Sequence, residues 1–370
     1  MKILADAHIP YLRGVAEQFG EVEYLPGNQF TRNVIREKDA LIVRTVTRFG
    51  EEILSGSRVK LICSATIGFD HIDTAWCDAH GVAWRTAPGC NAASVEQYVT
   101  ASLLYLAEKH QFDLKEKTIG IAGVGNVGSK VEAACRKLGM RVLLNDPPRE
   151  EREGSALFTD IETIRREADI ITFHTPLTGT GRHKTYHLVD DRFLASVEKR
   201  PFIINAARGS VTDSQALKKA IRNGNIAGAV IDCWENEPGI DRELLQLADI
   251  ATPHIAGYSA DGKWTAARMS LENLNKFFDS GIENPRYQDI PAPAEPVIDL
   301  RLIAPGQQLR HAVRHTCDPA AETVALKSSP EKFYWFRAGY PLRREYPAYR
   351  ILHADAVAAN TLFSLGFREG

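Results

Sequence analysis

The chain has 370 residues, and its 45 lysines and arginines nearly balance its 47 aspartates and glutamates, which leaves a formal net charge of −2 at pH 7. A chain of this length exceeds one ordinary hydrophobic core, so two or three domains are expected. The balanced charge argues against a nucleic acid or a membrane surface as partner, because such proteins usually carry a basic excess. No apolar run reaches the roughly 18 residues needed to span a membrane.

Cysteine use indicates a reducing compartment. The six cysteines show no CxxC spacing of the kind that holds zinc or forms a redox motif. The N-terminal residues lack an apolar core of signal-peptide length. We therefore expect a cytoplasmic protein with reduced thiols and no bound metal.

The first 94 residues alternate between short apolar runs and amphipathic segments. The predicted strands cover residues 2–4, 21–25, 40–44, 60–65 and 82–85, and helical patterns lie between them, for example over 11–19 and 73–80. Strands separated by helices predict a parallel sheet with crossover connections. A long helix is predicted over 95–110, with Ser94 and Gln97 placed as a capping box.

The most informative segment is 118–146. An apolar run leads into Gly123-x-Gly125-x-x-Gly128, and an amphipathic stretch and a second apolar run then end at Asp146. This order of strand, tight turn, helix, strand and acid is the one that a dinucleotide-binding fold requires. Gly123 permits the turn, Gly125 admits a pyrophosphate close to the backbone, and Gly128 lets the helix pack close to the strand. The helix N-terminus offers its N–H groups to the phosphates.

Asp146 also bears on which dinucleotide binds. It lies 18 residues past Gly128, placed to accept hydrogen bonds from the adenosine ribose hydroxyls, and its charge would repel the additional phosphate of NADP. Arg149 could in principle hold that phosphate, and the direction of its side chain does not follow from the sequence. NAD is therefore the predicted cofactor.

A complete second sheet is predicted from six strands, over residues 118–122, 141–144, 170–174, 202–205, 229–232 and 250–252. Helical segments separate them, as in a doubly wound sheet. A helix over 264–280 suits a return to the first domain. The predicted fold is thus α/β with two doubly wound parallel sheets. A Rossmann-type NAD domain over 95–264 is inserted in a flavodoxin-like substrate domain over 1–94 plus 265–285.

Beyond Pro285 the chain changes character. Prolines divide residues 286–306 into extended pieces typical of a linker. A helix is predicted over 307–314, a strand over 323–326 and an apolar helix over 354–365, and an aromatic and basic stretch starts at Phe333. Residues 286–370 are therefore expected to form a small α+β dimerisation domain, because exposed aromatic residues need a cover that a homodimer interface would provide.

Chemistry-bearing residues follow the strands of the second sheet, and ligands of such sheets bind beyond the carboxyl ends of the strands. Arg208, Glu237 and His254 follow three of these strands. Arg208 offers a planar fork for a substrate carboxylate. His254 can take the hydroxyl proton as hydride leaves for the nicotinamide, and Glu237 can orient the imidazole and stabilise its protonated form. This set predicts the oxidation of a 2-hydroxy acid.

These motifs resemble the D-2-hydroxy acid dehydrogenase family. The resemblance is carried by GVGNVG with its acid, INAARGSVTD (204–213), DCWENEP (232–238), PHIAGYS (253–259) and NAASVEQYV (91–99). It implies two α/β domains that close on a D-configured hydroxy acid, NAD as cofactor, a homodimer, and the catalytic roles given above. The resemblance also implies NAD contacts for Gly123, Gly125, Asn126, Val127, Gly128, Asp146, Thr175, Ala206, Ala207, Arg208, Asp232 and Gly257.

Four further features resemble one branch of this family, whose substrate is a phosphorylated four-carbon 2-hydroxy acid. They are the start KILADAHIPY, the segment SATIGFDHID (64–73), the string NDPPR (145–149) and the proline-rich C-terminal extension. The resemblance implies that the hydroxyls of Thr45, Thr66 and Tyr258 hold the substrate. Thr45 stands where this branch usually has serine, so the hydroxyl is kept and a methyl group is added.

The phosphate of such a substrate needs cationic donors. The sequence offers Arg44 and Arg48 in the first domain, and Arg343 and Arg344 in the extension. Exposure at the rim of an interface is an equally open interpretation of Arg343 and Arg344.

Two alternatives remain open at this point. D-3-phosphoglycerate dehydrogenase has the same catalytic set, although its longer forms carry a C-terminal domain of a different pattern. An NAD-sensing binding protein of the transcriptional corepressor type could retain the same residues without turnover.

Overall fold

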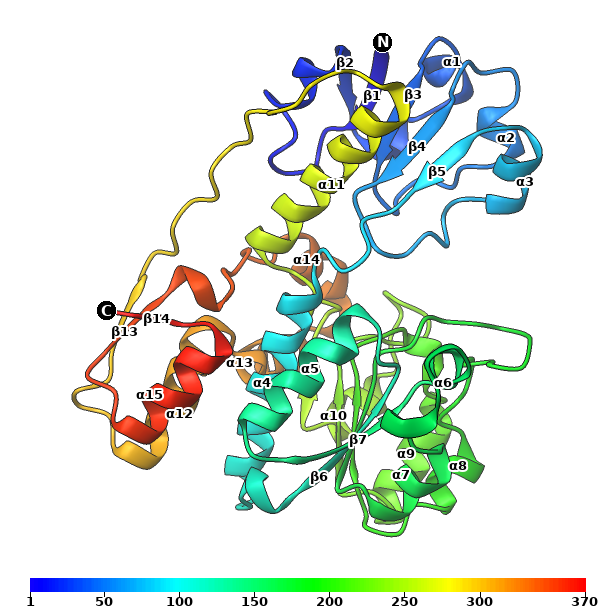
Figure 1. Ribbon diagram of the computed structural model, residues 1–370. Helices are drawn as coiled ribbons and strands as arrows, with labels where there is room; N and C mark the ends of the chain where they lie inside the picture. Colours follow the sequence, from blue (N-terminus) through cyan, green and yellow to red (C-terminus); the bar gives the residue numbers. More distant parts are fainter. The chain divides into compact units, whose positions relative to one another are not determined.

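The computed structural model describes residues 1–370, which divide into two compact units. One unit contains Met1–Asn91 and Ser259–Pro291, and the other contains Ala92–Tyr258 and Ala292–Gly370 (Figure 1). The chain therefore leaves the first unit after residue 91 and returns to it at residue 259, close to the boundaries expected at 94 and 265. None of the helices is long and apolar enough to cross a membrane.

The first unit is built on a five-stranded parallel sheet in the order β2-β1-β3-β4-β5. Its strands are β1 (Lys2–Asp6), β2 (Glu21–Leu25), β3 (Ala40–Val43), β4 (Leu61–Ser64) and β5 (Ala83–Arg85). Successive strand residues enter two different hydrophobic clusters, Ile3 and Ile42 on one face and Leu4 and Leu41 on the other. Both faces of the sheet are buried, as in other parallel sheets.

Helix α11 (Ala260–Phe278) packs against β4 and completes the first unit, as predicted. Ser259 caps it, because its hydroxyl accepts a hydrogen bond from the N–H of Gly262 at 2.8 Å. The other helices of this unit are α1 (Arg32–Ile35), α2 (Glu51–Leu54) and α3 (Thr74–Ala79). The predicted helix over 11–19 is wrong: only a short 3-10 turn forms there, since Tyr11 (φ 62) and Gly14 (φ 85) take left-handed conformations that interrupt a helix.

The second unit contains a six-stranded parallel sheet in the order β11-β10-β9-β8-β6-β7. Its strands are β6 (Thr118–Ala122), β7 (Arg141–Asn145), β8 (Ile170–Phe173), β9 (Phe202–Asn205), β10 (Gly228–Ile231) and β11 (Ile250–Ala251). All six predicted strands are confirmed, with ends that agree within one residue. The chain runs outward from β6 to β7 and then returns past β6 to β8, so the strand order reverses between β6 and β8. Ligands of doubly wound sheets bind at this switch point.

Helices cover both faces of this sheet. Ile170 and Ile204 enter one hydrophobic cluster, while their neighbours Ile171 and Ile203 enter another. The helices are α4 (Ala92–Lys109), α5 (Asn126–Lys137), α6 (Pro147–Glu153), α7 (Ile161–Glu167), α8 (Asp191–Ala195), α9 (Ser214–Arg222) and α10 (Arg242–Leu247). The predicted α/β fold with two parallel sheets is confirmed.

The long helix α4 begins earlier than predicted, which makes the expected capping box wrong. Ser94 and Gln97 lie inside the helix, and both are buried. The Ser94 hydroxyl donates to the carboxylate of Glu345 at 3.0 Å, and the Gln97 amide donates to the Thr316 hydroxyl at 3.0 Å. These polar residues therefore hold the C-terminal extension.

The extension packs onto the second unit. It contains α12 (Pro305–Thr316), α13 (Pro319–Ser328), α14 (Phe333–Ala338), α15 (Ala356–Leu365) and a small parallel sheet of β12 (Val297–Asp299), β13 (Arg350–Leu352) and β14 (Arg368–Glu369). Helices α12 and α13 pack against α4. Ile298, Val313 and Leu362 share one hydrophobic cluster with residues of α4 and α5. The hydrophobic core of the nucleotide-binding fold thus continues into the C-terminal extension.

The predicted strand over 323–326 is wrong, because these residues lie in α13. Asp318 caps this helix by accepting the N–H of Ala321, and Pro319 suits its first turn. The hydroxyl of Thr323 accepts the N–H of Ala251 at 2.9 Å. Helix α13 therefore covers edge strand β11, whose backbone groups would otherwise be exposed.

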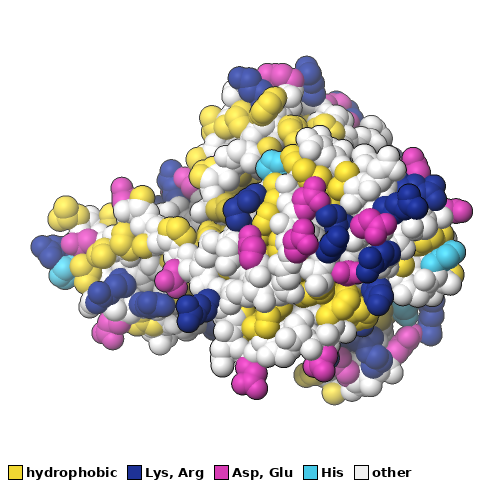
Figure 2. Space-filling model, turned by 90° about the horizontal axis from the view of Figure 1, so that it is seen from above, with side chains coloured by type: hydrophobic (Ala, Val, Ile, Leu, Met, Phe, Trp, Pro, Cys, Tyr) yellow, Lys and Arg dark blue, Asp and Glu magenta, His cyan; other side chains and the backbone are white.

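Charged side chains of both signs are interspersed on the face shown in Figure 2, with hydrophobic atoms scattered between them. No broad patch of one sign is visible on that face, in line with the net charge of −2.

Seven short 3-10 turns complete the structure: Ala16–Gln18, Gly27–Gln29, Leu114–Glu116, Ser155–Leu157, Gly209–Val211, Pro330–Lys332 and Tyr346–Ala348.

Candidate active site

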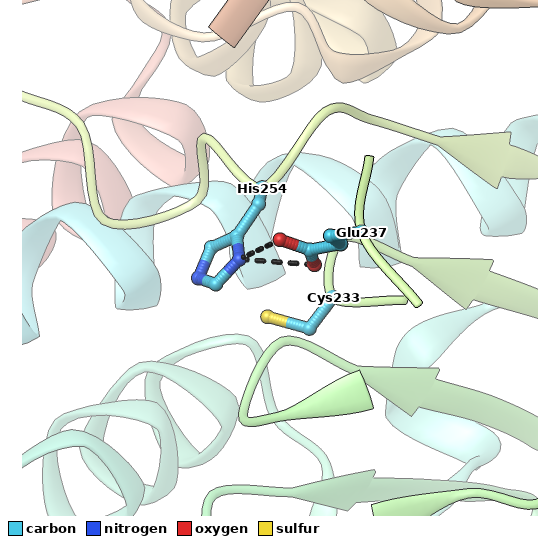
Figure 3. A group of neighbouring side chains, drawn as sticks. All are labelled: Cys233, Glu237 and His254. Carbon is cyan, nitrogen blue, oxygen red and sulfur yellow. Dashed lines mark hydrogen bonds and ion pairs between the residues drawn. The ribbon is translucent and has the colours of Figure 1, made fainter. Parts of the chain in front are cut away.

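Glu237 and His254 lie on the loops that follow β10 and β11, and their side chains form a hydrogen-bonded pair. Nδ1 of His254 is 2.9 Å from Oε2 and 3.0 Å from Oε1 of Glu237 (Figure 3). An ionised carboxylate only accepts hydrogen bonds, so Nδ1 carries a proton, and in the neutral imidazole Nε2 then has the lone pair. Figure 3 shows Nε2 directed away from Glu237. The imidazole is thus oriented to act as a base through Nε2.

The Glu237 carboxylate is held in its charged form. Burial alone would raise its pKa, but the hydrogen bond and charge of His254, the N–H of Trp234 at 2.8 Å and the nearby Arg337 outweigh burial. The pKa of Glu237 therefore lies below its ordinary value. A carboxylate that stays ionised can stabilise a positive charge that develops on the imidazole.

Asp232 fixes the backbone around His254. The carboxylate is 1% exposed, and it accepts hydrogen bonds from the N–H groups of Ile255 at 2.8 Å and Ala256 at 3.0 Å, and from the Thr252 hydroxyl at 2.7 Å. His254 itself has a φ of 58°, a left-handed conformation that persists in non-glycine residues only where the surroundings enforce it. Asp232 therefore positions the loop that carries His254, and its direct contact with NAD stays a prediction.

Arg343 of the extension also holds the loop that carries His254. It is 9% exposed, and its guanidinium donates to the carbonyls of Ile255 at 3.2 Å, Ala256 at 2.5 Å and Tyr258 at 2.9 Å. Its Nε donates to the side chain of Gln97 on α4 at 2.9 Å. The suggestion that Arg343 holds a substrate phosphate is wrong, because these buried contacts occupy the guanidinium.

Arg208 follows β9 and is brought towards the Glu237 loop by a glycine. A Cβ atom on Gly209 would lie 1.9 Å from the carbonyl oxygen of Trp234, so only glycine lets the two loops approach this closely. The guanidinium of Arg208 is half-buried and donates to the carbonyl of Ala207 at 2.8 Å. The sheet thus presents Arg208, Glu237 and His254 at one edge, after three adjacent strands.

Arg337 is a site residue that sequence reasoning missed. It lies on α14, and its Nη1 is 3.4 Å from Oε2 of Glu237, one hundred residues away in the chain. Nothing in its aromatic and basic surroundings separates it from Arg343 or Arg344. Only the packing of the extension brings it to the catalytic pair.

The glycine loop has the shape that a dinucleotide requires. A Cβ atom on Gly123 would lie 2.7 Å from the backbone of His174, and one on Gly128 would lie 2.0 Å from the Gly123 carbonyl oxygen. A Cβ atom on Gly125 would meet nothing within 4 Å, and Gly125 is exposed at the start of α5. The loop is therefore tight where it packs on the sheet and open where a pyrophosphate would pass.

Thr175 adds an unpaired polar group beside this loop. Its backbone nitrogen would lie 2.8 Å from a Cβ atom on Gly123, and its hydroxyl is buried without a hydrogen-bond partner. A buried polar atom of this kind usually marks an absent ligand or water. The other predicted NAD contacts lie on α5 and on the loops after β9 and β11: Asn126, Val127, Ala206, Ala207 and Gly257.

Asp146 directly follows β7, and it also holds the glycine loop. Its carboxylate accepts the N–H of Val124 at 2.8 Å and the N–H of Arg149 at 3.0 Å. The side chain of Arg149 points back to the carbonyl of Val124 at 2.5 Å and pairs with Glu153 at 2.6 and 2.9 Å. Because each carboxylate oxygen can accept further hydrogen bonds, Asp146 can still bind a ribose.

The substrate residues expected in the first unit lie at the ends of β3 and β4. Thr45 is exposed, and the Thr66 hydroxyl donates to the carbonyl of Gly68 at 3.0 Å and lies 2.6 Å from the Ser64 hydroxyl. Arg44 pairs with the buried Asp6 through two contacts of 2.9 and 3.2 Å. Tyr258 and Arg344 belong to the second unit.

Cys233 lies beside the catalytic pair, and its Sγ and ligand atoms of Glu237 and His254 lie within 4.8 Å of one another (Figure 3). Burial raises the pKa of the Cys233 thiol well above its ordinary value, and the thiol donates to the carbonyl of Ala207 at 3.4 Å. A protonated thiol is a poor metal ligand, and the other two groups already bind each other. The geometry favours an acid–base pair over a metal centre.

Comparison with known proteins finds relatives along nearly the whole chain. Residues 91–256 match the family model of the NAD binding domain of D-isomer specific 2-hydroxyacid dehydrogenases. The chain is 50% identical to the erythronate-4-phosphate dehydrogenase of Bacteroides thetaiotaomicron over 354 residues, which cover 95% of this chain and 99% of the relative. It is 45% identical to that of Porphyromonas gingivalis, over 99% of this chain and 100% of the relative.

Among solved structures, the NAD⁺-bound 3-phosphoglycerate dehydrogenase of Entamoeba histolytica superimposes with a TM-score of 0.64 at 22% identity. The match covers 79% of this chain and 99% of that protein. At this level of identity the likeness shows the fold.

Proposed function

This chain belongs to the erythronate-4-phosphate dehydrogenase family of NAD-dependent oxidoreductases, and we propose that it oxidises 4-phospho-D-erythronate to (R)-3-hydroxy-2-oxo-4-phosphobutanoate. The 2-hydroxyl loses a proton and C2 loses a hydride, so one NAD⁺ becomes NADH and one proton is released. We propose that this reaction serves pyridoxine biosynthesis.

The observation that carries the proposal is the pairing of His254 with Glu237. The carboxylate fixes the proton on Nδ1, at 2.9 and 3.0 Å, and leaves Nε2 to accept the proton of the substrate hydroxyl. Glu237 then stabilises the imidazolium that forms. General base catalysis of this kind is worth roughly 10²–10⁴-fold in rate.

Arg208 is proposed to bind the substrate carboxylate. A guanidinium binds a carboxylate through two parallel hydrogen bonds, which fixes the orientation of C2 as well as its position. In the first unit, the hydroxyls of Thr45 and Thr66 are proposed to bind the polar carbon chain, and Tyr258 is proposed to do so from the second unit. Arg44 is a weaker candidate for a substrate contact, because two of its donors bind Asp6.

NAD, when bound, supplies the hydride acceptor. The backbone of Gly125 and the N-terminus of α5 would hold its pyrophosphate, and Asp146 would hold its adenosine ribose. The unpaired hydroxyl of Thr175 would contribute a further hydrogen bond. The negative charge of Asp146 favours NAD over NADP.

We further propose a homodimer. Tyr334 and Trp335 of α14 are 63% and 72% exposed, and a second copy of the chain would cover these large aromatic side chains. Sedimentation velocity of the full chain tests this: a monomer at micromolar concentration would contradict it. The cytoplasmic location stays a prediction.

The substrate is tested by a direct assay of NADH formation with 4-phospho-D-erythronate and with D-3-phosphoglycerate, in the presence of a hydrazine that traps the oxo acid. The proposal expects a kcat/KM for the four-carbon acid that is at least about a hundredfold higher, the discrimination available to a well-fitted site. Turnover of D-3-phosphoglycerate alone would overturn the substrate, and an absence of turnover with tight NAD binding would favour a sensor protein.

A further inference from the structure

The C-terminal extension brings one arginine to the catalytic pair. Nη1 of Arg337 is 3.4 Å from Oε2 of Glu237, and the same guanidinium hydrogen-bonds the phenol of Tyr258 on the loop that carries His254. The side chain is 33% exposed. These residues all belong to one compact unit, so their arrangement is set by packing within that unit.

The guanidinium of Arg337 is incompletely satisfied. Its Nε is buried and has no hydrogen-bond partner. Its contact with Glu237, at 3.4 Å, is longer than the about 2.7–2.9 Å usual for a charge-assisted hydrogen bond. Since a guanidinium has five N–H donors and the side chain of Arg337 is partly exposed, this arginine is accessible to an anionic ligand.

Two of the other arginines considered for an anion, Arg343 and Arg44, are engaged by groups of the protein. Arg343 is buried, and its guanidinium donates to backbone carbonyls and to the side chain of Gln97. Arg44 is paired twice with Asp6. Arg337 is the arginine that combines an unpaired buried donor with a position beside Glu237.

Charge balance of the proposed substrate requires a second cation. The substrate carries a carboxylate on C1 and a phosphate on C4, with the reacting hydroxyl between them. If Arg208 binds the carboxylate on C1, the phosphate on C4 needs its own donors. The Glu237 carboxylate would repel a nearby phosphate unless a cation were beside it. Arg337 is a cation that contacts this carboxylate.

From these contacts we propose that Arg337 binds the phosphate of the substrate and makes the C-terminal extension part of the specificity site. This inference rests on the proposed function, because it takes the substrate to be a phosphorylated hydroxy acid. Arg337 is a substrate-binding residue in this scheme, and Glu237 holds it in place before the substrate arrives.

The test compares Arg337→Met and Arg337→Lys with wild type on two substrates, 4-phospho-D-erythronate and D-erythronate, which lacks the phosphate. Arg337→Met should raise KM for the phosphorylated acid about 10- to 100-fold, as expected for loss of charge-assisted hydrogen bonds. Its loss of kcat/KM for D-erythronate should be at least about tenfold smaller than its loss for the phosphorylated acid, because D-erythronate has no phosphate contact to lose. Lysine should restore part of the affinity, since it keeps the charge and loses the planar fork.

Inhibition by inorganic phosphate gives a second measurement, which does not require turnover of D-erythronate. Its inhibition constant against the phosphorylated acid should rise about tenfold in Arg337→Met, by the same loss of a charged contact. Arg301→Met is the matched control: this arginine lies in the extension, is 64% exposed and pairs with Asp299. Thermal unfolding of each variant shows whether it is folded.

Distinct outcomes overturn the inference. An equal loss on both substrates would show that Arg337 acts on Glu237 and His254 instead of on the phosphate. No change in KM or in phosphate inhibition would show that it does not reach the substrate. If wild type oxidises D-3-phosphoglycerate and not 4-phospho-D-erythronate, the proposed function fails, while the phosphate inhibition still tests Arg337 separately.

Discussion

Replacing Glu237 by glutamine tests the acid–base pair with very little change in side-chain shape. The amide oxygen can still accept the hydrogen bond from Nδ1 of His254, but the negative charge is gone. The carboxylate lies 2.9–3.0 Å from Nδ1, and at an effective dielectric constant of about 20 the attraction of two unit charges at that distance is about 5.5 kcal/mol.

Only part of this attraction reaches the transition state. The side chains of His254 and Glu237 are 26% and 18% exposed, the amide keeps one hydrogen bond, and Arg337 already offsets some of the negative charge. We expect a loss of about 2–4 kcal/mol, which lowers kcat about 30- to 1,000-fold. KM should change little, because the developing imidazolium charge exists only in the transition state.

The assay measures kcat and KM across pH for wild type, Glu237→Gln and the matched control Glu235→Gln. Glu235 lies on the same loop and binds another histidine, with Nε2 of His187 at 2.8 Å. The control should stay within about twofold of wild type, because Glu235 binds His187 and the N–H of Ser214 while Glu237 binds His254. A kcat for Glu237→Gln within about threefold of wild type would refute the role given to this carboxylate.

His254→Ala should leave the dissociation constant of NAD unchanged and abolish turnover; substantial residual kcat would place the base elsewhere. Glu96 is buried, and burial raises its pKa from 4.5 to about 7, so its ionisation favours unfolding. The stability that this group contributes is fully present below pH 4.5 and is lost as pH rises through 7. Glu96→Gln should therefore be more stable than wild type by up to about 3 kcal/mol at pH 8 and nearly as stable as wild type at pH 5. Urea unfolding at both pH values measures this, and a stability difference that does not increase from pH 5 to pH 8 would contradict it. Asp146→Asn should narrow the preference for NAD over NADP about tenfold or more in kcat/KM, through loss of repulsion of the additional phosphate; an unchanged ratio would assign cofactor choice to another residue.

Features that depend on local order in the chain could be predicted from the sequence. The glycine loop, Asp146 at the end of β7 and the six strands of the second sheet follow from apolar runs, glycine spacing and helical patterns. Arg208, Glu237 and His254 could be placed at one edge, because strands of a parallel sheet end on the same side. The sequence likewise determined the cofactor class, since the loop and its acid occupy one short segment.

Tertiary structure alone decided how the extension meets the site. Arg337 contacts Glu237 across 100 residues, and Arg343 reaches the His254 loop across 87 to 88 residues, distances over which no local pattern carries information. The stretch 323–326 reads as a strand by composition, yet α13 forms because Asp318 caps it and edge strand β11 needs cover. The sequence therefore determined which chemical groups the sheet presents. Long-range packing decided that Arg337 contacts Glu237 and that Arg343 is buried, because burial depends on neighbours that only the folded chain supplies.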